Sequence, residues 1–167
     1  MGNKLKGPLP FQSIYQIVVK DIDGQDISMS KYQNKVMLVV NVACEWGLTT
    51  KNYDQLMELD NNYRERGLSV LAFPCNQFFG QEPGTHEEIK SFVRGIGAKF
   101  DVFAKIKVNG KEACDLYKFL RLSCRLRGSK IGWNFGKFLV DRQGNVFQYY
   151  GPRTEPRKIV QDIERLL

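Results

Sequence analysis

Two uninterrupted apolar runs separated by a helical pattern constrain the fold of this chain more than any other feature of its sequence. The first run, "KVMLVVNVA", spans residues 35–43, and the second, "LSVLAFPC", spans residues 68–75. Runs without polar alternation are typical of strands buried on both faces of a sheet. Residues 50–66 between them carry apolar side chains at helical spacing, and Gly67 follows as a stop signal. This arrangement predicts a right-handed βαβ unit with parallel strands.

The remaining segments predict further strands and helices around this unit. Residues 14–29 read as two short strands that turn at Asp23–Gly24. Four more elements follow the second apolar run: a helix opened by a capping box at Thr85-x-x-Glu88, a helix over 112–120, a hairpin over 134–151 and a helix over 155–167. The order ββ, βαβ, α, α, ββ, α predicts an α/β fold of the thioredoxin-like type, with a central mixed sheet flanked by helices and an N-terminal β-hairpin.

The length and composition favour one domain. A chain of 167 residues with 43% hydrophobic residues is long enough to bury one core, so we expect a single domain over residues 11–167. Residues 1–10, "MGNKLKGPLP", are expected to form a flexible arm, since they lack the apolar core of a signal peptide. No apolar run reaches the roughly 20 residues that a membrane-spanning helix needs.

The cysteines and the single histidine limit the metal chemistry and indicate a compartment. The four cysteines have neither C-x-x-C spacing nor a zinc pattern, and a histidine-rich metal site is excluded because His86 is the only histidine. We therefore expect no metal, reduced thiols and a cytoplasmic location. Cys44 and Cys75 end the two adjacent strands, and we hypothesise that they can contact each other.

The positive charge is concentrated in the second half of the chain. Residues 1–83 carry 8 Lys/Arg against 9 Asp/Glu, whereas residues 84–167 carry 17 against 9. This asymmetry indicates either an anionic partner or a solvated basic face. The chain shows no nucleic-acid recognition motif, so nucleic acid is not expected as a partner.

The carboxyl ends of the parallel strands are where an α/β sheet binds ligands. In "VNVACEWGLTT", residues 40–50, the first strand stops at a short loop that leads into a helix. The positive end of a helix lowers the pKa of a thiol placed there. The loop is therefore suited to an activated sulfur or selenium nucleophile, yet the residue at its apex is Trp46.

Three blocks of the sequence resemble the signatures of the glutathione peroxidase family, in the family's order. "NVACEWGLT" resembles N-V-A-S-x-C-G-x-T, in which C is the peroxidatic cysteine or selenocysteine. "LAFPCNQFFGQEPG" is similar to L-A-F-P-C-N-Q-F-G-x-Q-E-P-G, and "IGWNFGKFLVDRQG" is similar to I-K-W-N-F-x-K-F-L-V-D-x-x-G. The resemblance extends over about Ile14 to Leu166. It implies a thioredoxin-like peroxidase that binds no cofactor and uses glutathione as its reducing co-substrate.

The resemblance implies four catalytic positions. The nucleophile falls on Trp46, and its hydrogen-bonding partners fall on Gln81, Trp133 and Asn134. In the family these amide and indole donors keep the sulfur or selenium ionised. The anion attacks the peroxide O–O bond, and two glutathione thiols then reduce the resulting acid. Because an indole cannot cycle in this way, the chain as written is expected to be inactive.

Three explanations of Trp46 remain open. In the first, the natural residue is selenocysteine, whose UGA codon differs by one base from the tryptophan codon UGG. In the second, the protein is a non-catalytic relative that binds a membrane or a partner. In the third, Cys44 is the nucleophile. We favour the first, since the other three catalytic positions are intact. In the family the resolving cysteine usually falls where this sequence has Arg94, so glutathione is the implied reductant rather than thioredoxin.

A basic loop and two departures from the family blocks bear on the substrate. "RLSCRLRGSK" holds four cations that are candidates to bind glutathione carboxylates or lipid phosphates, with a solvated surface as the alternative: Arg121, Arg125, Arg127 and Lys130. Phe79 stands where a glycine is common, and Gly132 replaces a usual lysine. The short segment over 120–133 resembles the monomeric phospholipid-hydroperoxide type. This resemblance implies a monomer that acts on lipid, organic and hydrogen peroxides, with access to membrane surfaces.

Overall fold

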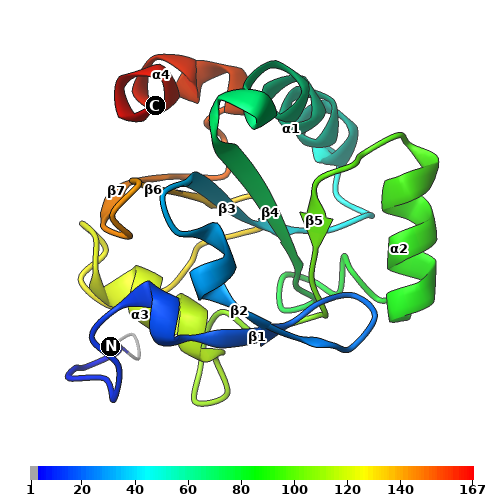
Figure 1. The fold of residues 1–167 in the computed structure, drawn as a ribbon. Coiled ribbons are helices and arrows are strands. Elements are labelled where there is room, and N and C mark those ends of the chain that lie inside the picture. Colours follow the sequence, from blue (N-terminus) through cyan, green and yellow to red (C-terminus); the bar gives the residue numbers. More distant parts are fainter. Residues whose placement is uncertain (1–3) are drawn as a thin grey trace.

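The computed structural model describes residues 4–167, and it confirms the predicted βαβ unit (Figure 1). Strand β3 spans Val36–Val42, helix α1 spans Thr49–Tyr63 and strand β4 spans Leu68–Pro74. The two strands are parallel, and their register pairs the last residue of each, Val42 with Pro74. Both carboxyl ends therefore lie side by side at one edge of the sheet.

The central sheet is mixed and has the order β5-β4-β3-β6-β7. Strands β6 (Lys137–Val140) and β7 (Val146–Tyr150) form the predicted hairpin, and β6 runs antiparallel to β3. Strand β5 (Asp101–Val102) is parallel to β4 and was not predicted, because two residues carry no readable alternation. The mixed sheet and the thioredoxin-like fold are confirmed.

The N-terminal hairpin forms a separate two-stranded sheet from β1 (Val18–Lys20) and β2 (Asp26–Ser28). Its turn is held by the Asp21 carboxylate, which accepts the backbone N–H groups of Asp23 and Gln25 at 2.9 Å each. Gly24 has a φ of +84°, which a glycine adopts without steric cost, so the predicted turn signal is confirmed.

Three further helices complete the fold. Helix α2 (His86–Gly95) begins with the predicted capping box, in which the Thr85 hydroxyl and the Glu88 side chain each accept the other residue's backbone N–H. Helix α3 spans Asp115–Leu122, and α4 spans Val160–Leu166 after a 3-10 turn over Pro156–Ile159. Shorter 3-10 turns occupy Ile14–Gln16, Met29–Tyr32 and Arg64–Arg66.

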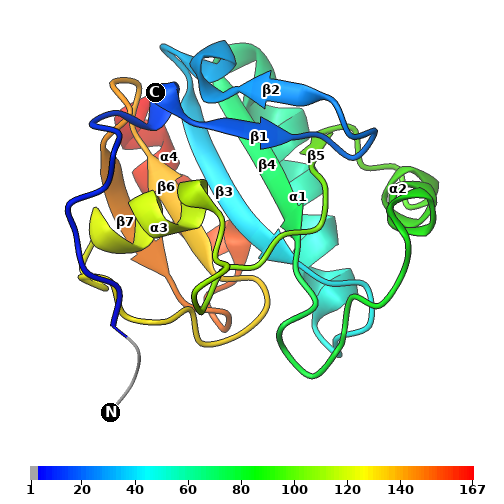
Figure 2. The ribbon, with the colours of Figure 1, turned by 90° about the horizontal axis from the view of Figure 1, so that it is seen from below.

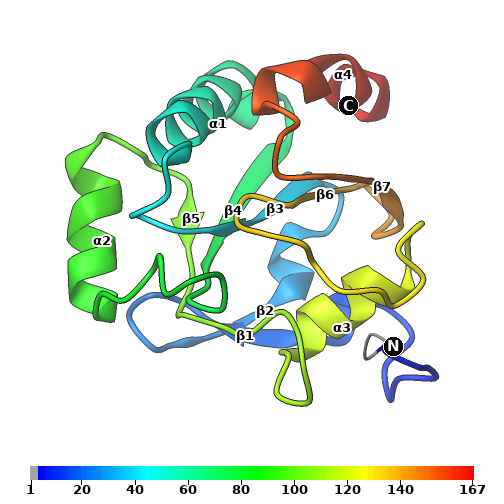
Figure 3. The ribbon, with the colours of Figure 1, turned by 180° about the vertical axis from the view of Figure 1, so that it is seen from behind.

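The helices cover the two faces of the sheet unequally (Figures 1 and 3). Alternate side chains of β3 point into two separate apolar clusters. Leu38 and Val40 belong to the cluster that also holds buried residues of α1, α2 and α4. Met37 and Val39 pack on the opposite face with α3 and the N-terminal hairpin. Burial on both faces explains why the sequence of β3 shows no alternation.

The described part of the predicted N-terminal arm has no regular secondary structure. Residues 1–3 of that arm lie outside the described residues. The backbone N–H of Leu5 donates to Gly128 O at 2.9 Å, which ties this segment to the loop after α3. Within residues 4–167, no helix is both long enough and apolar enough to cross a bilayer.

Candidate functional site

The loops that follow β3 and β4 and the loop that precedes β6 gather at one edge of the sheet (bottom of Figure 2). The β3–α1 loop makes a tight turn around Thr49, whose hydroxyl accepts the Trp46 backbone N–H at 3.0 Å. The same hydroxyl donates to Ala43 O at 2.9 Å. Trp46 is therefore held at the apex by backbone contacts that do not involve its side chain.

The Trp46 ring is half-buried and stacks on Phe135, with ring centroids 5.7 Å apart and planes inclined by 19°. Trp46 also lines a cavity of about 580 Å³ whose other wall includes Trp133. The remaining lining residues come from the loops before β6 and after β7: Gly132, Gly151, Pro152, Arg153 and Thr154. The structure thus brings the predicted nucleophile position and the predicted tryptophan donor to the same cavity.

The two predicted amides contact each other beside this apex. Asn134 is fully buried, and its Nδ2 donates to Gln81 Oε1 at 2.6 Å. The Gln81 backbone carbonyl in turn accepts the backbone N–H of Glu45, the residue before Trp46, at 3.0 Å. Contacts therefore link the loops of β3, β4 and β6. The described hydrogen bonds include none from Gln81 or Trp133 to the indole of Trp46.

The backbone of Trp133 is hydrogen-bonded to strand β3, the strand that precedes the Trp46 loop. Its carbonyl accepts Asn41 Nδ2 at 3.0 Å, and Asn41 is a fully buried residue of β3. Its ring lies against Phe78 and Phe79, with centroid distances of 5.6 and 5.1 Å. Since Trp133 is itself half-buried, one part of its ring remains open to the cavity.

Cys44 faces a second, smaller cavity of about 180 Å³ between the β3–α1 loop and α2. Its backbone N–H donates to Glu82 Oε1 at 3.0 Å, and Glu82 is fully buried. Burial, followed by the Glu82 carboxylate and Glu45, raises the pKa of the Cys44 thiol well above its usual value. Burial likewise raises the pKa of the Glu82 carboxyl. A thiol in this environment is not activated, which argues against Cys44 as the nucleophile.

The hypothesised contact between Cys44 and Cys75 is not formed. Cys75 is fully buried in the cluster on the α3 face of the sheet, whereas Cys44 lines its cavity with Ile89 and Phe92, which pack on the opposite face. Cys44 lies two residues beyond Val42, and Cys75 lies one residue beyond Pro74, the register partner of Val42. Because side chains alternate along an extended chain, the two cysteine side chains point to different sides. All four cysteines are free thiols.

The four predicted cations do not act as one group, since Arg121 lies in the last turn of α3 and the other three lie in the loop after it. Arg121 is 1% exposed, and its guanidinium donates to the carbonyls of Val108, Gly128 and Ser129 at 2.8–3.0 Å. It therefore stabilises the loop from inside and is not available to a solute, which corrects the expectation for this arginine. Arg125 is exposed, lies over the Tyr149 ring at 5.5 Å and donates to its carbonyl.

Arg127 and Lys130 are exposed, as a substrate-binding role would require. Neither of them lines the cavity beside Trp46; the cation in that lining is Arg153, which sequence reasoning did not select. Its signal was weak, since "GPRTEP" matches no quoted block. Lys137 was also missed, although a lysine directly before the apolar run "FLV" is an unusual strand residue. Across residues 4–167, no cluster of three or more His, Cys, Asp or Glu side chains could hold a metal ion.

Sequence comparison finds a family profile and individual proteins that match this chain. The sequence profile described as "Glutathione peroxidase" matches residues 14–121. A glutathione peroxidase of Schistosoma mansoni is 53% identical over 161 residues, which cover 94% of each chain. A Helianthus annuus protein named "Probable phospholipid hydroperoxide glutathione peroxidase" is 49% identical over 162 residues, covering 96% of this chain and 89% of that protein.

Solved structures agree with the sequence comparison. The crystal structure of T. cruzi GPX1 superposes with a TM-score of 0.76 at 34% identity, covering 93% of this chain and 96% of the other. A thioredoxin-family thiol:disulfide interchange protein from Chlorobium tepidum superposes with a TM-score of 0.68, covering 96% of this chain and 99% of the other. At 14% identity, the second likeness shows the thioredoxin-like fold alone.

Proposed function

The chain belongs to the glutathione peroxidase family, and from that premise we propose that its natural activity is the glutathione-dependent reduction of phospholipid, organic and hydrogen peroxides. The family activity is peroxide reduction with glutathione as reductant and without a prosthetic group. The substrate range rests on relatives that are named for phospholipid hydroperoxides. The observation that carries the proposal is the meeting of Gln81, Trp133 and Asn134 with position 46 at one edge of the sheet.

The proposed natural residue at position 46 is selenocysteine, or a cysteine in its place. A selenolate or thiolate there would attack the nearer peroxide oxygen, breaking the O–O bond and releasing an alkoxide that takes up a proton to leave as the alcohol. One glutathione thiol would displace water from the oxidised residue, and a second would release glutathione disulfide. Each turnover thus reduces one peroxide by the two electrons of two thiols.

The residues of this chain would support that chemistry by position and polarity. The Gln81 amide accepts a hydrogen bond through Oε1 from the fully buried Asn134, so its NH2 group is the end that remains to donate. Its role toward the nucleophile anion is that of a charge-stabilising hydrogen-bond donor. Arg153 is the cation in the cavity lining and is proposed to bind a carboxylate of glutathione or a lipid phosphate. The proposal further takes the protein to act as a cytoplasmic monomer.

The decisive assay is a gain of function. Trp46→Cys should reduce phosphatidylcholine hydroperoxide with glutathione, whereas the unchanged chain and Trp46→Ser should not. Serine matches the size of cysteine but cannot pass through an oxidised sulfur state, so it controls for simply opening the cavity. If Trp46→Cys shows no turnover above Trp46→Ser, the peroxidase proposal is wrong.

A second candidate is a non-catalytic member of the family that binds through the same edge. The packing of the Trp46 ring on Phe135 favours it, because the indole is accommodated by a parallel aromatic neighbour. The coding nucleotide sequence separates the two candidates. A native UGA with a selenocysteine insertion element supports the enzyme, and a native UGG supports the binding protein.

A further inference from the structure

A pocket of about 280 Å³ lies at the opposite end of β4 from the candidate site. Its lining includes Leu68, Ser69 and Val70, the first three residues of that strand. Leu68 is paired with Val36, the first residue of β3, so the pocket lies at the amino ends of the two parallel strands. At about 3.3 Å per residue, the length of β4 corresponds to a separation of about 20 Å from the carboxyl end. We call it the amino-end pocket.

One wall of the amino-end pocket is an open stretch of strand edge. Strand β5 pairs only with Leu71 and Ala72, so within residues 4–167 no strand lies beside the first three residues of β4 on that side. An open strand edge presents backbone N–H and C=O groups to whatever lies next to it. The other walls come from the segment that leads into β5, from the region around the 3-10 turn before β3, and from the end of α1.

Positive charge is in excess in this pocket. Its charged lining residues are four cations and two carboxylates: Lys31, Lys35, Arg64, Lys99, Asp60 and Asp101. Asp101 accepts the Tyr32 hydroxyl at 2.6 Å and lies 3.8 Å from Lys31 Nζ. Lys35 and Lys99 are exposed, and neither forms an ion pair with another residue of the described chain. The lining therefore attracts an anion.

Arg64 is held at the pocket by a buried carboxylate. The Asp60 side chain is 4% exposed, and both of its oxygens accept from the guanidinium, Oδ1 from Nε at 3.0 Å and Oδ2 from Nη2. This contact uses two of the five N–H donors of the arginine, so three remain. A guanidinium whose plane is already fixed is suited to bind phosphate oxygens, because its donors match their geometry.

We propose that the amino-end pocket binds a phosphate dianion, either free or as part of a small phosphate ester. The excess of two positive charges matches the charge of about −2 that a phosphate monoester approaches at neutral pH. A water molecule takes up about 30 Å³, so a pocket of this size has room for more than one phosphate group. Buried apolar side chains line the pocket as well and would contact an attached organic group: Leu68, Val70 and Phe100.

Phosphate binding here is independent of the proposed peroxidase activity. The amino-end pocket shares no lining residue with the Trp46 cavity. A binding measurement also needs no peroxide and no turnover. Its failure would therefore leave the proposed function untouched, and an inactive Trp46→Cys variant would leave the phosphate site untouched.

Isothermal titration calorimetry with three compounds tests the site. Inorganic phosphate, phenyl phosphate and uncharged phenol are titrated into the unchanged chain at low ionic strength, where charge attraction is least screened. The two phosphates should bind and phenol should not. Tighter binding of phenyl phosphate would identify an ester as the ligand, whereas equal binding of the two would identify the free ion. Binding of neither phosphate, or equal binding of phenol, would overturn the proposal.

Removal of the two lysines without ion pairs tests whether the pocket is where phosphate binds. The double variant Lys35→Gln and Lys99→Gln should bind phosphate about 25-fold more weakly, about fivefold for each exposed charge. It should unfold at the same temperature as the unchanged chain, because no contact between residues is lost. The matched control, Lys111→Gln with Lys158→Gln, removes two exposed lysines that lie outside the pocket and also lack ion pairs. Equal losses in the two double variants would mean attraction to the basic protein as a whole and would refute a specific site.

Nuclear magnetic resonance gives the location directly. Added phosphate should shift the backbone amide resonances of Ser69 and Phe100, which line the pocket, and leave those of Glu45 and Trp46 in place. Arg64→Lys keeps a cation beside Asp60 but loses the planar group, so phosphate should bind about tenfold more weakly. Shifts confined to the Trp46 loop, or full affinity in Arg64→Lys, would contradict the assignment of this pocket.

Discussion

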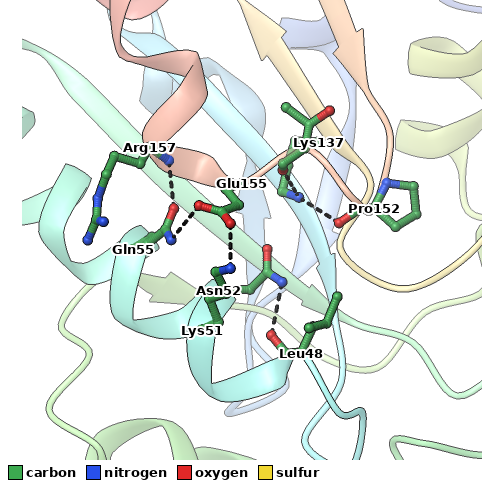
Figure 4. A network of polar contacts seen from close by, with 9 residues as sticks. Leu48, Lys51, Asn52, Gln55, Lys137, Pro152, Glu155 and Arg157 are labelled. Atoms are coloured by element: carbon green, nitrogen blue, oxygen red, sulfur yellow. Dashed lines mark hydrogen bonds and ion pairs between the residues drawn. The ribbon is translucent and has the colours of Figure 1, made fainter.

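The buried lysine beneath the candidate site leads to a prediction about pH. Lys137 begins β6, is fully buried, and donates from Nζ to Thr154 O at 2.6 Å and to Pro152 O at 3.3 Å (Figure 4). These two carbonyls flank Arg153, so the lysine holds the loop that forms one wall of the cavity. Burial lowers the pKa of Lys137 from 10.5 to about 7, and Glu155, which also pairs with Lys51, opposes the shift.

The pKa shift of Lys137 sets the size and the sign of the pH dependence of the free energy of unfolding. A displacement from 10.5 to about 7 corresponds to roughly 5 kcal/mol between the charged and neutral forms. Because the pKa of Lys137 is lower in the folded chain, the unfolded chain binds the proton more tightly. The free energy of unfolding is therefore lowest below pH 7 and rises as the pH increases toward 10.5. Up to about pH 8.5, where cysteines of the unfolded chain begin to ionise and act in the opposite sense, the recovery should be about 2 kcal/mol.

Urea unfolding of the unchanged chain and of Lys137→Met at about pH 6 and about pH 8.5 measures this recovery. Methionine keeps an unbranched side chain of similar length but cannot titrate. The rise of about 2 kcal/mol should be present in the unchanged chain and absent in Lys137→Met. Lys51→Met is the control, because Lys51 shares the partner Glu155 but is half-exposed, and it should retain the rise. If all three proteins respond equally to pH, Lys137 stays an ammonium ion and the desolvation argument is wrong.

Three further substitutions test the site and its support. Glu82→Gln should lower the pKa of the Cys44 thiol and speed its alkylation by iodoacetamide about tenfold at mildly alkaline pH, as followed by peptide mapping; an unchanged rate would contradict the assigned carboxylate effect. Arg121→Met should lower the free energy of unfolding in urea by about 3–5 kcal/mol, because buried carbonyls lose their donor; a loss below about 1 kcal/mol would mean that water replaces the guanidinium. Asn134→Ala in the Trp46→Cys background should reduce the peroxide rate about 100-fold if the amide pair stabilises the anion, and equal rates would remove Asn134 from the catalytic group.

The sequence predicted the elements whose burial leaves a clear pattern. Strands β3 and β4 are buried on both faces, so their apolar runs could be read directly. Strand β5 has two residues and exists through its pairing with β4, a contact distant in sequence that no local pattern reports. Helix α3 begins at Asp115, three residues after the predicted start, because residues 112–114 leave the helical conformation.

The candidate site was readable from motifs, but its supporting contacts were not. The resemblance identified Gln81 and Asn134, while their hydrogen bond joins residues 53 positions apart and appears only in three dimensions. Arg121 was grouped with the basic loop, whereas it lies in the last turn of α3 and its side chain points inward. Its position four residues after the buried Tyr117 was the available signal. Lys137 was missed because its two acceptors lie in a loop beyond the next strand.

The turn at position 46 is held by bonds that do not involve the Trp46 side chain. The turn is held by the Thr49 hydroxyl and by the contact of Glu45 with Gln81, and none of these bonds uses the side chain at position 46. The contribution of the indole is apolar packing on Phe135, which a smaller residue would lose without altering the turn. A cysteine or selenocysteine there should therefore meet the same neighbouring amides. For this reason the activity of Trp46→Cys tests the site itself rather than a rearranged loop.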